Sequence, residues 1–145
     1  MEEIKTKYYI YIDKDEKEHT IRPCIIDEVE EVIRLYNKID TDIMFNNLPQ
    51  PMLKYDKDGK AILDKQGNFV LQIDRKTKEP KLDYTRFDAM KQLLEKALDE
   101  DYDELKKWVD VENSIDIIDK YVGISKLKKK MEQMITEKMA VQSSN

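Results

Sequence analysis

The residues that break regular secondary structure are few in this chain of 145 residues, which contains only 3 Gly and 4 Pro. An all-β domain needs many tight turns, and turns depend on Gly and Pro. The scarcity of both therefore favours helices. Most of the breakers fall between residues 40 and 81, so we expect the turns to be concentrated there: Pro49, Pro51, Gly59, Gly67 and Pro80.

The amino-terminal third predicts a β-hairpin followed by one helix. Residues 8–12 are aromatic or β-branched, residues 13–18 are all charged, and residues 19–22 alternate polar with larger side chains, as expected for two strands around a turn. Asp27 then precedes apolar residues at helical spacing. It also has a glutamate three positions later, which is the pattern of a helix amino terminus.

The middle segment carries turn sequences and little helical periodicity. The sequences Asp-Lys-Asp-Gly (56–59) and Asp-Lys-Gln-Gly (64–67) lie on either side of the apolar run 61–63, and a second, largely apolar run, 69–73, follows. This order predicts a small hairpin or a three-stranded ribbon. A mobile insertion is the alternative. A structureless run of about 40 residues is unusual inside a compact domain, which favours the ribbon.

The carboxy-terminal half predicts four helices in close succession, each with an apolar side. The residues expected to start them are Thr85, Asp101 or Asp103, Asn113 or Ser114, and Ser125. Gly123 is expected to end the third helix, because glycine enters the left-handed conformation without a steric penalty.

Together these elements predict a single domain (1–145) of the mainly α (α+β) class. It comprises a hairpin plus first helix (1–39), a β ribbon or irregular insertion (40–82), a bundle of about four helices (83–141) and a frayed tail (142–145).

Composition argues against several classes of partner. The net charge of -5 opposes general nucleic-acid binding, which depends on Lys and Arg. No apolar run reaches the length needed to cross a bilayer, and the amino terminus has no signal-peptide pattern. The single cysteine, Cys24, fits a reducing compartment, so a cytoplasmic protein without a membrane partner is expected.

The spacing of reactive side chains predicts no enzyme, metal or cofactor. His19, the only histidine, lies beside a charged turn and away from any evident Cys or Asp cluster, and no glycine-rich phosphate loop is present. A DNA-reading helix-turn-helix over residues 114–134 is disfavoured. Asp119 and Lys129 would fall where its packing requires a small and an aliphatic side chain.

The expected last helix differs in charge from the residues before it. Residues 83–123 contain 12 acidic and 6 basic residues, whereas residues 125–141 contain 5 Lys and 2 Glu. This helix either rests on the acidic helices or offers its methionine face to a partner, since thioethers adapt to varied apolar shapes. The residues expected to form or border a partner groove are Trp108, Tyr121, Leu127, Met131, Met134 and Ile135.

Two stretches of the helical half, 108–113 and 121–128, together with an early strand pair leading to Arg22-Pro23, resemble the small tail assembly chaperones of long-tailed bacteriophages. The segment 40–81 has no counterpart in that resemblance. The resemblance implies a non-enzymatic protein of the infected bacterial cytoplasm. Such a protein coats the long tape measure protein, keeps it soluble and passes it to the tail tube subunits.

Two other functions stay open. One alternative is a phage-encoded inhibitor that binds a host or defence protein through its acidic surface. A DNA-binding regulator is a further alternative with less support. Its oligomeric state, including a homo-oligomer, is not determined by these patterns.

Overall fold

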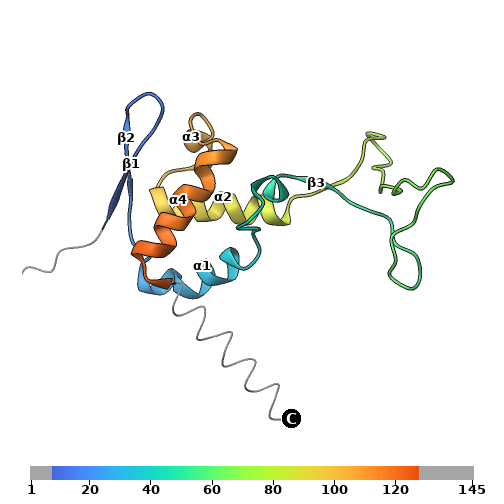
Figure 1. Ribbon diagram of the computed structural model, residues 1–145, viewed down its shortest axis with the longest axis horizontal. Coiled ribbons are helices and arrows are strands. Elements are labelled where there is room, and N and C mark those ends of the chain that lie inside the picture. The colour runs from blue at the N-terminus through green and yellow to red at the C-terminus, as the bar shows by residue number, and fades with distance from the viewer. Residues whose placement is uncertain (1–7, 128–145) are drawn as a thin grey trace, which may run out of the picture.

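The computed structural model describes residues 8–127, which fold into a helical body with a long projection (Figure 1). The elements in chain order are β1 (Tyr9–Ile12), β2 (Glu18–Ile21), α1 (Val29–Tyr36), β3 (Gln50–Pro51), β4 (Leu82–Asp83), α2 (Thr85–Leu98), α3 (Tyr102–Leu105) and α4 (Val111–Ile124). One short 3-10 turn (Ile26–Glu28) lies between β2 and α1, and a second (Met44–Asn47) lies between α1 and β3.

The core of the body lies where α1, α2 and α4 meet. Each helix buries one apolar side, as the helical period requires, and the fully buried side chains include Val32 of α1, Leu93 and Leu94 of α2, and Ile117 and Ile118 of α4. The hairpin adds Ile21, which is also fully buried.

Strands β1 and β2 pair in antiparallel register, with Tyr9 opposite Ile21 and Ile12 opposite Glu18. The turn between them is built on Asp13, whose Oδ1 accepts the backbone N–H groups of Asp15 (2.8 Å) and Lys17 (3.0 Å). Beyond β2, the Arg22 amide donates to the carbonyl of Ala97 at 3.1 Å. The hairpin is therefore attached to the carboxyl end of α2.

Residues 50–83, which we call the arm, leave the body between the second 3-10 turn and α2 and project away from the helices (Figure 1). The stem is the antiparallel pair β3–β4, with Pro51 opposite Leu82. Three tight turns follow, at residues 56–60, 64–68 and 74–79. In each of them the carboxylate of the leading aspartate accepts two backbone N–H groups of its own turn.

Two closed rings of three backbone hydrogen bonds hold the arm together. In the outer ring, Lys54 donates to Val70, Val70 to Ile62 and Ile62 to Lys54, each at 2.9 Å. An inner ring joins Met52, Gln72 and Lys81 in the same cyclic way, at 2.8–2.9 Å. Each ring is thus a three-way junction of hairpins. None of residues 50–83 is buried, so the backbone bonds and the turns hold the arm without a hydrophobic core.

The expectation of a mainly α chain with a four-helix bundle after the insertion is wrong. The described residues form an α+β protein with two small antiparallel sheets, β1–β2 and β3–β4. Within residues 8–127, three helices follow the arm, and α3 is a single short turn. Residues 99–110 form only the short helix α3, which adds Leu105 to the core, and the helical body is completed by α1 from the amino-terminal part. The expected final helix lies mostly outside the described residues.

Two helix boundaries also differ from the sequence-based expectation. Helix α4 starts at Val111, because Asp110 caps it and Asn113 completes a reciprocal capping box. Gly123 does not end this helix but lies within it. The left-handed residue after the helix is Lys126, with φ of 55°.

Candidate functional site

The six residues expected to form a partner groove are not brought together on the described surface. Tyr121 and Leu127 are buried in the core. Trp108 is half-buried against the hairpin. Met131, Met134 and Ile135 lie outside the described residues. In this conformation neither Tyr121 nor Leu127 faces a partner.

Trp108 instead belongs to a stacked cluster with the hairpin. Its ring lies 3.7 Å from that of His19, with 12° between the planes, and 6.0 Å from that of Tyr11. The hairpin returns the chain, so that His19 contacts one aspartate of the charged turn: its Nε2 donates to Asp13 Oδ2 at 2.6 Å. This hydrogen bond is the main cause that holds the pKa of Asp13 below its usual value.

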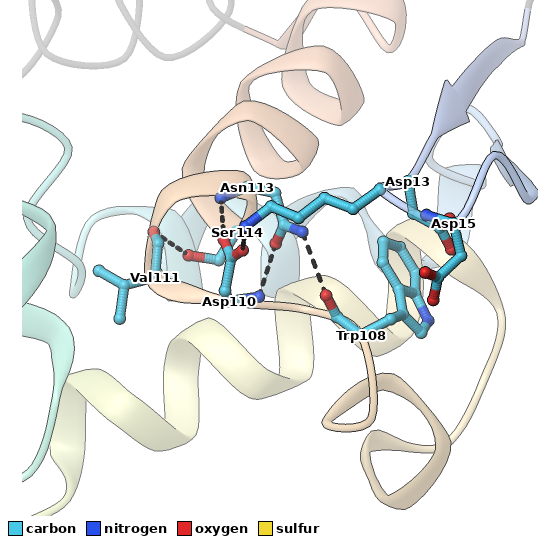
Figure 2. A network of polar contacts seen from close by, with 8 residues as sticks. Asp13, Asp15, Trp108, Asp110, Val111, Asn113 and Ser114 are labelled. Carbon is cyan, nitrogen blue, oxygen red and sulfur yellow. Dashed lines mark hydrogen bonds and ion pairs between the residues drawn. The ribbon is translucent and has the colours of Figure 1, made fainter.

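A polar network attaches the same turn to the start of α4 (Figure 2). Lys14 Nζ lies 3.1 Å from the carboxylate of Asp110. Asp110 accepts the backbone N–H of Asn113 at 2.7 Å, and the Asn113 amide group donates to the carbonyl of Trp108 at 3.3 Å. The bond from the Asn113 backbone is also the main cause that lowers the pKa of Asp110. Trp108, whose carbonyl belongs to this network, also lines a groove.

This groove, of about 800 Å³, lies between the hairpin turn, the end of α2 and α3. Seven carboxylates and two lysines line it, together with His19 and Trp108. The carboxylates are Asp13, Asp15, Glu95, Asp99, Glu100, Asp101 and Glu104. The surface at this end of the body is therefore polar and strongly acidic.

The arm presents a surface of the opposite character. Directly opposed residues of an antiparallel pair share a face of the sheet, and so do alternate residues of one strand. The opposed pairs of the arm are Pro51 with Leu82, Leu53 with Leu71, Tyr55 with Ala61, Leu63 with Phe69, and Ile73 with Pro80. All ten residues are apolar. We call them the apolar face.

The outer part of the apolar face is open to solvent. Tyr55 is 59% exposed, Leu63 55%, Phe69 60% and Ile73 46%. Leu53, Ala61 and Leu71 are only half-buried. Scattered apolar residues are normal on a protein surface, whereas a contiguous set on one face usually marks an interaction site.

The sequence contained a signal for the apolar face that the turn-based prediction did not use. The residues that directly flank the first two turns, Tyr55, Ala61, Leu63 and Phe69, are apolar and occupy odd positions, although Ile62 and Val70 at even positions are apolar as well. The prediction of hairpin turns in this segment is confirmed, but the closed three-way pairing was not anticipated.

Within residues 8–127, no group of three or more His, Cys, Asp or Glu side chains is placed to hold a metal ion. None of the helices in that range is both long and apolar enough to span a bilayer. None of the protein-family models, curated proteins or solved structures compared with the chain matches it.

Proposed function

We propose that this chain is a non-enzymatic binding protein of the tail assembly chaperone type, which covers an apolar stretch of the tape measure protein in the bacterial cytoplasm. The observation that carries the proposal is the apolar face of the arm, a set of ten apolar positions on a projection without buried residues.

The arm exposes its apolar face to water, which lowers the stability of the isolated arm. A small sheet that leaves its apolar side in water is marginally stable, because the hydrophobic effect does not favour its folding. The ring hydrogen bonds and the aspartate turns keep the face formed in advance. A partner that covers it therefore gains apolar burial without having to order the arm.

The proposed partner matches this surface in its chemistry. A tape measure protein, as the resemblance implies, is long, helical and apolar along one side, and would aggregate unless that side were covered. An amphipathic helix lying on an apolar platform is a common mode of recognition. In this proposal tail tube subunits join the complex at a later step.

Co-expression tests the proposal. The full chain is expected to move a tape measure fragment from the pellet to the supernatant, and Phe69→Asn together with Leu63→Ser is expected to abolish this effect. Both side chains are exposed, so the variant is expected to remain folded.

Ile26→Asn is the matched control, because Ile26 is an exposed apolar residue of the body, 89% exposed and outside the arm. This variant is expected to solubilise the fragment as the wild type does. A fragment that stays in the pellet with wild-type chain, or that is rescued equally by the arm variant, would contradict the proposal.

The acidic groove supports a second candidate, inhibition of a host or defence protein that offers a basic surface. It has seven carboxylates against two lysines. In this case a protein retained from host lysate is expected to dissociate at high salt and to be lost with Glu100→Lys and Glu104→Lys. Retention unaffected by these changes would exclude the groove as its binding site.

A further inference from the structure

We propose that the arm selects a partner segment whose apolar side is bordered by carboxylates, so that the partner is recognised by charge as well as by apolar contact. The inference rests on the proposed function and names the chemistry of the segment that the apolar face receives. The observation behind it is the basic edge around that face.

The charge of the arm is opposite to that of the body. Residues 50–83 contain eight Lys or Arg and six Asp or Glu, a net charge of +2. The described remainder, residues 8–49 and 84–127, contains 12 basic and 21 acidic residues, a net charge of -9. The basic residues of the arm are all exposed: Lys54, Lys57, Lys60, Lys65, Arg75, Lys76, Lys78 and Lys81.

The arm cations have fewer ion pairs than the body cations. Seven of the 12 basic residues of the described body, including Lys14, Lys91 and Lys96, lie within 4.0 Å of a carboxylate. In the part of the chain that the structure describes, no basic residue of the arm has such an ion pair. Their charges are therefore available to a partner.

The carboxylates of the arm are largely committed to its own backbone. Asp56, Asp64 and Asp74 each accept two N–H groups of their turn. The backbone bonds from the turn are the main cause that lowers the pKa of Asp74. These anions face the turn amides, whereas six of the basic side chains extend from the same three turns. A partner placed on the apolar face therefore meets cations at its borders.

The composition of the face favours a protein over a nucleic acid. Single-stranded nucleic acids bind by stacking bases on aromatic rings in a basic groove. Only Tyr55 and Phe69 among the ten residues are aromatic, and the others are aliphatic or proline. Face-to-face pairing of two copies is disfavoured as well, because it would bring two arms of net charge +2 together.

Two fluorescein-labelled peptides test the inference by polarisation with the full chain. Both have about 18 residues, roughly five helical turns, with leucine on one side. One carries glutamate on the other side and one carries lysine. We expect the glutamate peptide to bind roughly tenfold or more tightly, and its affinity to fall by about tenfold from low salt to roughly 0.5 M salt.

The two peptides distinguish recognition by the arm from non-specific attraction. The whole chain has a net charge of -5, so non-specific attraction would favour the lysine peptide. The variant Lys57→Gln, Lys65→Gln, Lys76→Gln is expected to lose the preference for glutamate. The body variant Arg34→Gln, Lys38→Gln, Lys106→Gln removes the same number of exposed charges and is expected to keep it.

The outcomes separate the inference from the proposed function. Equal binding of both peptides, or tighter binding of the lysine peptide, overturns the inference. If the peptides bind in either of these ways and Phe69→Asn abolishes their binding, the proposed function still stands. Binding of neither peptide overturns both. Tighter binding of a labelled poly-uridine strand, or a dimer at low salt in sedimentation, overturns the inference in favour of a nucleic acid or a second copy.

Discussion

Asp13 connects three parts of the body through one carboxylate. Its Oδ1 shapes the hairpin turn, and its Oδ2 accepts from His19, whose ring stacks on Trp108. The side chains of Asp13 and His19 are only 6% and 14% exposed, so the pair is mostly sheltered from water. The hairpin is thus attached to the α3–α4 connection by side chains as well as by its backbone.

The lowered pKa of Asp13 predicts a pH dependence with a definite sign. A carboxyl whose pKa is lower in the folded state than in the unfolded chain, where it is about 3.9, stabilises the fold above that value. The stabilisation is lost as the pH falls through the folded-state pKa. Asp13→Asn is therefore expected to unfold at lower urea concentration than wild type at pH near 7.

The difference between the two midpoints is expected to shrink as the pH is lowered from about 4 towards 2, where the wild-type carboxyl becomes protonated. Asp15→Asn is the matched control, because Asp15 is an exposed aspartate of the same turn. A difference between wild type and Asp13→Asn that is constant across this range would show that the charge of Asp13 does not contribute.

At the scale of single residues, the sequence predicted turns well and side-chain partners poorly. The charged run 13–18 indicated a hairpin turn, but the Asp13 to His19 contact depends on the register that places Tyr11 opposite His19. Tyr121 was expected to form or border a partner groove. It is buried, because it lies on the same side of α4 as the buried Ile117 and Ile118, four and three residues before it.

The arm is an element whose stability depends on its turns. Gly67 has φ of 83° and Gly59 has φ of 80°, in the left-handed region that other residues adopt at a cost of about 1–2 kcal/mol. An added Cβ at Gly67 would meet no atom within 4 Å, so a substitution there strains the backbone without a clash.

Gly67→Ala is therefore expected to weaken the arm by about 1 kcal/mol and leave the body unchanged. Hydrogen exchange of amides in residues 52–81 is expected to accelerate several-fold, while thermal unfolding of the helices stays the same. Gly123→Ala is the matched control, since Gly123 is helical and its exchange pattern in the arm should match wild type. Unfolding of the helices together with the arm would show that the two are coupled.

Sequence periodicity predicted the elements of the body better than those of the arm. The stripe of α2 and the acidic start of α1 follow local rules, so both were found close to their observed positions. The rings of the arm join residues 54, 62 and 70, whose pairing depends on three turns acting together. Local turn rules predict each turn but not which strands pair across the junction.

The whole molecule separates its two chemical surfaces. The acidic groove lies by the hairpin and α3, and the basic, apolar arm extends from the opposite end of α2 (Figure 1). A partner held on the arm is thus kept away from the acidic surface. This separation could not be predicted from the overall charge of -5.

The most direct test of the central claim is to map the surface that a partner covers. Backbone amide resonances of the isotope-labelled full chain are recorded by NMR during titration with the leucine–glutamate peptide. We expect the largest shifts to fall on residues 53–73, with Phe69, Leu63 and Tyr55 among them, and α1, α2 and α4 to change little. Shifts concentrated on the helices or around Trp108, with the arm unchanged, would contradict that claim.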